Sequence, residues 1–145
     1  MKKTALFLLV LLFGCSPVKE SVEIKDAEIP SGTWLTYEGI LPCEDCGGIK
    51  TTLDIYIDYG DPNPPYVVTE VYLGKNNGTP VVTEGTYNTL RGTDVDPDAT
   101  VLELDYDKPE RLKYLVRVGN EAIRLLSSDA KEMTSEQNYT LQRIQ

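Results

Sequence analysis

The sequence predicts an all-β protein, a small eight-stranded antiparallel up-and-down barrel. Three observations indicate this fold class. Apolar and polar side chains alternate strictly over Ile49–Tyr59, as in a strand with one buried face. Eight short strand-like segments follow one another at nearly regular spacing, separated by turn-favouring residues. Apart from Pro17 and Pro30, every proline lies in a loop or at the end of an expected strand. Because eight strands can close on themselves, a barrel would leave no free sheet edge.

The amino terminus has the features of a bacterial lipoprotein signal. Two lysines precede the apolar run Ala5–Phe13, which is too short to span a bilayer and suits the core of a signal peptide. Gly14 and Cys15 follow directly and resemble a lipobox. We therefore expect residues 1–14 to be a signal peptide and Cys15 to be the lipidated first residue of the mature chain. The alternative is an ordinary secretory signal with a chance cysteine.

The rest of the chain is expected to divide into a tether and one domain. Residues 15–32 are polar and show no clear periodicity, so we expect a flexible tether. Residues 33–145 are then the β-barrel domain, which is an ordinary length for one domain.

The first two strands flank a tight corner. Thr33–Leu41 forms the first strand and ends at Pro42, which fixes its own φ and has no N–H to donate. Trp34, in this strand, is expected to cap the barrel floor. Ile49–Tyr59 forms the second strand, with the face of Leu53 turned inward, and it stops at the proline-rich segment 61–65.

The next two strands form a hairpin. Tyr66–Gly74 is rich in valine and tyrosine, which favour strands. Asn77 and Gly78 favour a tight reversal. Val81–Leu90 then forms the fourth strand, with Gly85 expected at a bend or bulge.

The last four strands are separated by polar, turn-rich segments. Residues 107–110 and 119–120 are expected turns, and 127–136 is a long loop. The strand before residue 119 places Tyr114, Val116 and Val118 on its apolar face. The four expected strands are Thr100–Tyr106, Arg111–Val118, Glu121–Leu126 and Asn138–Ile144.

Composition excludes several functions. Without Lys2 and Lys3 the chain has 12 basic against 23 acidic side chains, a net charge of −11. An acidic body has no basic surface to follow a phosphate backbone, so we expect no nucleic-acid partner. The chain contains no histidine, which removes histidine-based metal sites and catalytic triads. No carboxylate pair or nucleophile–base pair stands out, so we expect no enzymatic activity.

A C-x-x-C pair, Cys43 and Cys46, is the clearest chemical feature of the chain. It lies in the corner between the first two strands, framed by Pro42, Gly47 and Gly48. Pro42 ends the strand before it, and the glycines permit the positive φ that a reversal needs. Both side chains are therefore expected near the surface at one end of the barrel.

Three interpretations of the pair remain open. In an oxidising compartment it would form a structural disulfide. As two thiolates it would suit Cu(I), with Met133 as a candidate third ligand, whereas two ligands are too few for a closed zinc site. A redox dithiol is the third interpretation, although Glu44 and Asp45 disfavour thiolate by raising the thiol pKa.

Two other groups of residues are candidate sites. Asp94, Asp96 and Asp98 alternate as in a calcium loop, but the glycine and the distal glutamate of an EF-hand are missing, which favours a solvated acidic loop. Tyr56 and Tyr72 are candidates to line the mouth of a cavity, against a default role in packing.

Several motifs of the chain resemble one family. These are Tyr-x-Gly-x-Leu-Pro-Cys-x-x-Cys-x-Gly-Ile-x-Thr-x-Leu over residues 37–53, Tyr72-Leu73-Gly74, Gly85-Thr86-Tyr87 and the ending Asn138-Tyr139-Thr140-Leu141. Together they are similar to the NlpE N-terminal domain family of envelope lipoproteins, over most of the chain after residue 34.

This resemblance implies a lipocalin-like β-barrel, anchored by lipid in the envelope of a Gram-negative-type bacterium, at the outer membrane. It also implies a role in copper resistance or in sensing envelope stress, with Cu(I) as the candidate metal at Cys43 and Cys46. The alternative is a barrel that binds an apolar ligand or an envelope protein, with a purely structural disulfide.

Overall fold

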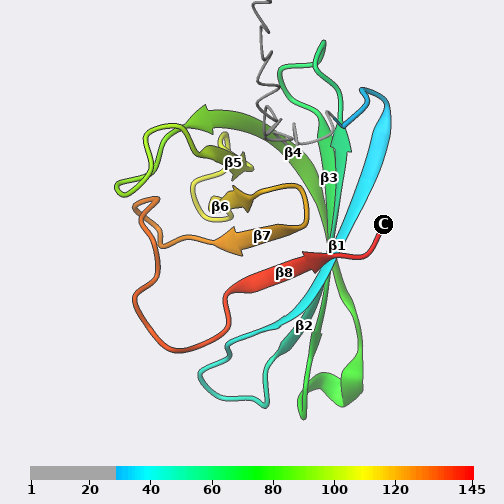
Figure 1. Cartoon of the computed structure of the whole chain (residues 1–145). Coiled ribbons are helices and arrows are strands. Elements are labelled where there is room, and N and C mark those ends of the chain that lie inside the picture. Colours follow the sequence, from blue (N-terminus) through cyan, green and yellow to red (C-terminus); the bar gives the residue numbers. More distant parts are fainter. Residues whose placement is uncertain (1–28) are drawn as a thin grey trace, which may run out of the picture.

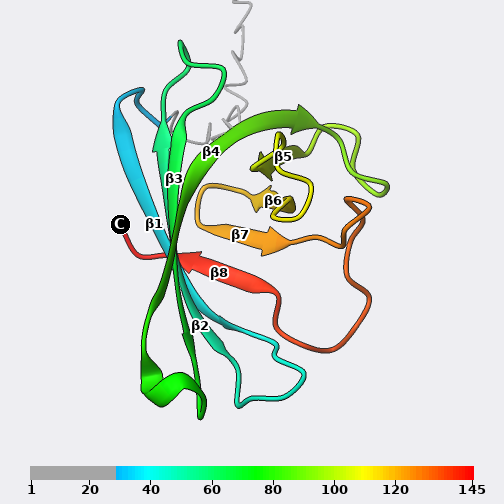
Figure 2. The same ribbon diagram turned by 180° about the vertical axis from the view of Figure 1, so that it is seen from behind.

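The protein is a closed antiparallel barrel in which the strands follow chain order from β1 to β8 (Figure 1, and Figure 2 from behind). The computed structural model describes residues 29–145, and Cys15 and the predicted signal peptide lie outside this range. In the described range no helix is long and apolar enough to cross a membrane. The predicted fold class is confirmed. The elements are β1 (Thr33–Leu41), β2 (Ile49–Ile57), β3 (Pro65–Tyr72), the 3-10 turn η1 (Asn76–Gly78), β4 (Val81–Arg91), β5 (Thr100–Leu104), β6 (Lys113–Val118), β7 (Ala122–Leu125) and β8 (Thr140–Arg143).

β1 pairs with β2 along one edge and with β8 along the other, and the second pairing closes the barrel. Tyr37 lies beside Arg143, and Glu38 lies beside Gln142. Gly39 continues β1 past this pairing, and a Cβ there would lie 2.7 Å from the Thr140 carbonyl oxygen. A real Cβ cannot approach a backbone oxygen so closely, so this part of the seam requires glycine.

The register of β1 and β2 defines the two ends of the barrel. Leu41 pairs with Ile49 at the end that carries the cysteine corner, here called the cysteine end. Thr33 pairs with Ile57 at the opposite end, here called the open end. Since the strands run alternately up and down, the β2–β3, β4–β5 and β6–β7 connections all belong to the open end. The long strand β4 curves over this end toward β5 (Figure 1).

The core fills the barrel with inward-facing side chains. On β2 the inward positions are Leu53, Ile55 and Ile57, as the alternation predicts. Burying each such side chain contributes roughly 1.5–3 kcal/mol to folding. The largest completely buried side chains of the main core are Tyr37, Leu35, Leu53, Ile55, Leu104, Ile123 and Leu141.

Strands β5 and β6 bury both of their faces, which the sequence did not predict. Leu115 points into the main core, whereas Val116 belongs to a second small cluster with Ala99, Val101 and Leu126. The chain after β7 covers this outer face, and the Leu126 N–H donates to the Tyr114 carbonyl oxygen at 2.9 Å. The predicted apolar face of this strand is therefore the outer one.

Three further expectations are corrected. Trp34 does not cap the barrel floor: it lies on the outer face, 44% exposed, with its ring centroid 5.2 Å from that of Tyr56. Tyr59 is not an inward strand residue, because β2 ends at Ile57 and Tyr59 is 62% exposed. Gly85 pairs regularly with Tyr66 inside the β3–β4 ladder instead of making a bulge.

A buried carboxylate explains Gly85. Asp105 is completely buried after β5 and has a φ of 52°, a conformation in which aspartate is enriched. Its carboxylate accepts a 2.6 Å hydrogen bond from the Tyr66 hydroxyl and forms ion pairs with Arg111 at 2.8 Å and Lys108 at 3.3 Å. A Cβ on Gly85 would collide with this carboxylate and with the Tyr66 ring. The network therefore fixes the β5–β6 turn against β3 and β4.

Replacing Asp105 by asparagine should destabilise the protein by about 2–4 kcal/mol. Asparagine keeps the shape and tolerates the positive φ, but it removes the charge that Arg111, Lys108 and the Tyr66 hydroxyl contact. Urea unfolding measures the change. Asp107→Asn is the matched control, because Asp107 is exposed and also pairs with Lys108; its effect should stay within about 0.5 kcal/mol. Equal effects of the two variants would contradict the assignment.

Candidate functional site

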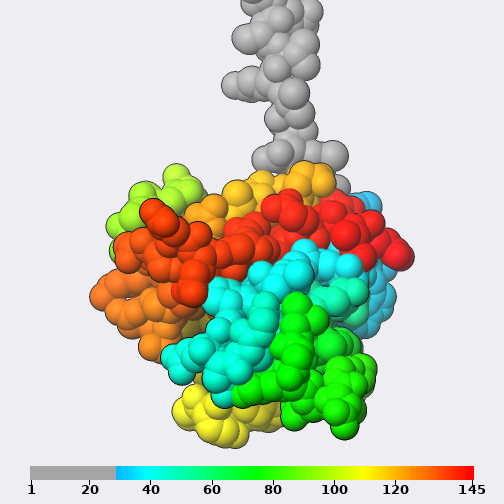
Figure 3. Space-filling view, turned by 90° about the horizontal axis from the view of Figure 1, so that it is seen from below, coloured from blue at the N-terminus to red at the C-terminus, as the bar shows by residue number. Residues whose placement is uncertain are grey.

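The cysteine corner joins β1 to β2 at the cysteine end. Cys43 and Cys46 form a disulfide, with their Cα atoms 5.4 Å apart. Both residues are partly exposed, and Glu44 and Asp45 between them are exposed. Figure 3 shows this corner between the β3–β4 hairpin and the β7–β8 loop, as seen from below. The structure thus brings the two predicted sulfurs together at the surface.

Backbone hydrogen bonds hold the corner independently of the disulfide. The Gly47 N–H donates to the Leu73 carbonyl oxygen at 3.0 Å, and the Leu73 N–H donates to the Gly48 carbonyl oxygen at 2.9 Å. Gly48 has a φ of +129°, and a Cβ there would meet the Ile40 side chain. The corner is therefore fixed as an extension of the β2–β3 ladder.

An ion pair makes a further link from the corner to the β3–β4 hairpin. Lys75 contacts the Asp45 carboxylate, and this hydrogen bond holds the pKa of Asp45 below its usual range. The lysine charge offsets one of the two acids that the sequence places between the cysteines, which weakens the effect expected from Asp45 on the thiols.

A shallow hollow of about 270 Å³ lies beside the disulfide. It is bounded by Cys43 and Cys46 and, on its other side, by Gln137 and Asn138 of the β7–β8 loop. Asn138 donates from its side-chain nitrogen to the Ile40 carbonyl oxygen at 3.1 Å, which ties this loop to β1. Met133, the candidate third ligand, is not among the residues that line the hollow. Within residues 29–145 no cluster of three or more cysteine or acidic side chains is placed to hold a metal.

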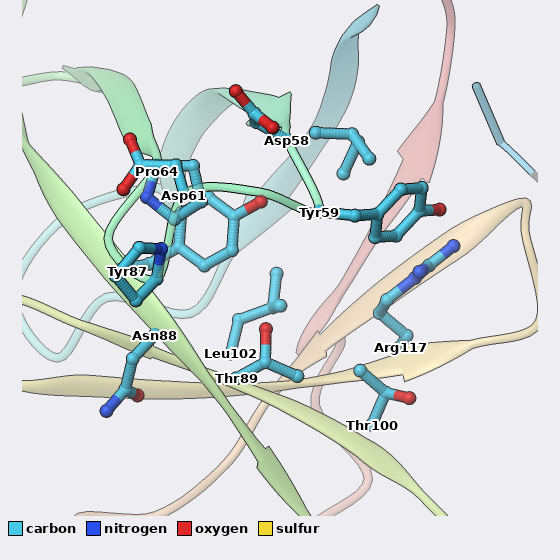
Figure 4. Close-up of a pocket in the computed structure, with 12 residues that line it drawn as sticks. Asp58, Tyr59, Asp61, Pro64, Tyr87, Asn88, Thr89, Thr100, Leu102 and Arg117 are labelled. Carbon is cyan, nitrogen blue, oxygen red and sulfur yellow. The ribbon is translucent and has the colours of Figure 1, made fainter. Parts of the chain in front are cut away.

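A larger cavity of about 610 Å³ lies at the open end of the barrel (Figure 4). This volume is in the range of small-molecule sites in proteins. Leu102, Thr89 and Thr100 lie in the lower part of the view, and Arg117 and Tyr59 lie on its right-hand side. The cavity is lined by Ile57, Asp58, Tyr59, Asp61, Pro62, Pro64, Tyr87, Asn88, Thr89, Thr100, Leu102 and Arg117.

The charge of Arg117, which lines this cavity, acts on the pKa values of two core tyrosines. Tyr87, which lines it, donates from its hydroxyl to the Tyr56 carbonyl oxygen at 2.7 Å. Burial raises the pKa of Tyr87 to about 12, and the charge of Arg117 opposes the rise. Burial also raises the pKa of Tyr37, again opposed first by Arg117. The Tyr37 hydroxyl and the side-chain oxygen of Asn88 are buried atoms without a hydrogen-bond partner in the described structure.

The other residues singled out in the sequence lie away from these two places. Tyr56 stacks on the outer face against Trp34, and Tyr72 ends β3; neither lines the cavity or the hollow. Asp94, Asp96 and Asp98 are exposed in the β4–β5 loop, where Arg91 pairs with Asp98 at 2.5 Å. The fold therefore does not gather them with the cysteine pair.

Sequence reasoning missed Arg117 as a cavity residue. Alternation takes the face of Val116 as the buried one, which places Arg117 on the opposite, solvent-facing side. The strand in fact buries both of its faces. The sequence does contain an indication: Arg117 lies two residues after Leu115, so it shares the strand face of Leu115, which points into the main core.

The fold and the two places described above define a class of protein: a small closed β-barrel with a disulfide on an exposed corner at one end and a cavity at the other. The sequence model of the NlpE N-terminal domain matches residues 37–136. The chain therefore belongs to the NlpE N-terminal domain family, which is a lipoprotein family and not a family of enzymes.

One relative supports the same assignment. The chain is 29% identical over 143 residues to Lipoprotein NlpE of Escherichia coli (strain K12), a match that covers 97% of this chain and 55% of that protein. The chain thus spans about half the length of this relative. No solved structure matches the chain.

The buried tyrosines should make the protein unstable at alkaline pH. Tyr66 and Tyr87 have pKa values raised to about 12, chiefly by burial. A phenol is neutral when protonated, so the unfolded chain loses these protons from about pH 10 while the folded chain keeps them. Their contribution to stability is therefore fully present below about pH 10 and falls between pH 10 and 12. Urea midpoints at pH 8, 10 and 11 test this, and Tyr87→Phe should flatten the alkaline decline. A midpoint that does not change up to pH 11 would contradict it.

Proposed function

We propose that the chain is a lipid-anchored module of the bacterial cell envelope whose cysteine corner responds to redox state and takes up Cu(I) when reduced. The observation that carries this proposal is a partly exposed disulfide on a corner that backbone hydrogen bonds also hold. Membership of a lipoprotein family supports the anchor, and the chemistry of paired sulfurs supports the metal.

Contacts other than the disulfide also hold the corner. The disulfide joins residues only three apart, and closing so short a loop stabilises a fold by about 2 kcal/mol. The bonds from Gly47 and Gly48 to Leu73 do not involve the sulfurs, and neither does the Lys75–Asp45 ion pair. Reduction would therefore leave Cys43 and Cys46 near one another at the surface.

A dithiol reductant can open the disulfide. The reductant gives two electrons and two protons to the Cys43–Cys46 disulfide and becomes a disulfide itself. One Cu(I) ion then replaces the two thiol protons and is held by both sulfurs, because thiolates are soft ligands that select Cu(I). The hollow beside the pair leaves the sulfurs open to an exchanging partner.

Reduced protein should bind about one Cu(I) ion through two sulfur ligands. Competition with a coloured Cu(I) indicator measures the affinity. Cys46→Ser should abolish competition, because a single thiolate remains. Asp94→Ser is a control on the exposed β4–β5 loop and should behave like the wild type. If reduced wild type and Cys46→Ser compete equally poorly, the pair has a structural role and the copper proposal fails.

The anchor predicts a change of cell fraction. Cys15→Ser should move the protein from the membrane fraction to the soluble fraction, because several acyl chains hold a protein stably where one holds marginally. Separation of inner and outer membranes then tests the proposed outer-membrane location. A wild-type chain that never incorporates labelled fatty acid would show that the lipoprotein interpretation of Gly14 and Cys15 is wrong.

A further inference from the structure

The open-end cavity contains an arginine that forms no ion pair within the described residues. Arg117 is half-buried on β6 and lines the cavity. Its guanidinium donates from Nη2 to the neutral side-chain oxygen of Asn120 at 3.1 Å, and no carboxylate of residues 29–145 forms an ion pair with it. Other arginines of the barrel do have acidic partners, such as Arg111 with Asp105 and Arg124 with Glu132. Partial burial of a charge without an opposite charge is unfavourable, so this position favours an anion.

The two acidic residues of the cavity serve the turn that follows β2. Asp58 accepts hydrogen bonds from the Gly60 N–H at 2.9 Å and from the Ser31 hydroxyl at 3.3 Å. Asp61 accepts from the Asn63 N–H at 2.9 Å. These contacts hold the β2–β3 loop over the cavity, and they occupy carboxylate oxygens with local donors. Neither carboxylate forms an ion pair with Arg117, so the guanidinium stays available to an anion that meets it directly.

The core of the barrel also holds a hydrogen-bond donor without an acceptor. Tyr37 is completely buried, and its hydroxyl has no partner in the described structure. Burial raises the pKa of this hydroxyl, and among the charges that act on it Arg117 comes first and lowers it. Arg117 itself suits an oxygen anion, because a guanidinium can donate two parallel hydrogen bonds to a carboxylate.

The remaining wall of the cavity is suited to an apolar body. Leu102 and Tyr87 are buried core residues, and Pro64 and Ile57 continue the apolar surface from the loop and from β2. Thr89 and Thr100 are small side chains on the adjacent strands β4 and β5, so they leave the space open (Figure 4). Such a mixture of apolar walls and a few polar groups is typical of small-molecule sites.

We propose that the open end of the barrel binds a small organic carboxylate with an apolar tail, with the carboxylate on Arg117 and the tail against Leu102 and Tyr87. This site lies at the opposite end of the barrel from the cysteine corner and does not depend on the proposed copper chemistry.

Isothermal titration calorimetry of the purified full chain with sodium octanoate tests the site. Octanoate should bind at about one per chain, and octanol and octylammonium, which have the same tail, should bind more weakly. Arg117→Gln should weaken octanoate binding roughly ten- to hundredfold, because a hydrogen-bonded charge pair is lost. Octanol has no charge to pair with Arg117, so its binding should not change. Arg91→Gln, on the exposed β4–β5 side, is the matched control and should bind as the wild type does.

A second variant separates binding from folding. Thr89→Trp should fill the cavity from β4 without touching the charge, and it should abolish octanoate binding while the circular dichroism spectrum stays that of a β protein. The proposal is overturned if octanoate does not bind the wild type at millimolar concentration, if octylammonium binds as tightly as octanoate, or if Arg117→Gln binds octanoate as the wild type does.

Discussion

Closure of the sheet at the β1–β8 seam is the constraint on which the rest of the structure depends. β1 must pair with β2 on one side and with β8 on the other, and the β8 backbone passes so close to Gly39 that no Cβ fits between them. Closure removes the free edges that two unpaired strands would expose. It also places the first strand along the whole height of the barrel, so that β1 contributes to both ends.

The two ends carry different chemistry because β1 begins at one and finishes at the other. Its last residue leads into the cysteine corner, where backbone bonds to Leu73 hold the turn and leave the sulfurs exposed. Its middle supplies Tyr37 to the core, where the charge of Arg117 acts on the pKa of both Tyr37 and Tyr87. Between these ends the barrel is filled by large side chains, so the cavity does not reach the cysteine corner. The proposed copper site and the proposed ligand site are therefore separate from one another on one small fold.

A buried charge network fixes the side of the barrel that apolar packing alone does not specify. Strands β5 and β6 bury apolar side chains on both faces, so hydrophobicity by itself permits either face to turn inward. Asp105 joins the turn between them to Tyr66 of β3, and the absence of a Cβ at Gly85 makes room for its carboxylate. This contact requires one arrangement of the β5–β6 turn, which places Leu115 and Arg117 on the inner side of the wall.

By itself the sequence determined the barrel, the inward face of β2 and the place of the cysteine corner. These features have local signals in the sequence. A strand with one buried face alternates apolar and polar side chains with a period of two, and tight turns are marked by proline and glycine. Only the tertiary structure decided that Trp34 faces solvent, that both faces of β6 are buried and that Arg117 enters a cavity. Those outcomes depend on which distant segments cover each face, such as the chain after β7, and contacts between residues far apart in the chain leave no periodic pattern in the sequence.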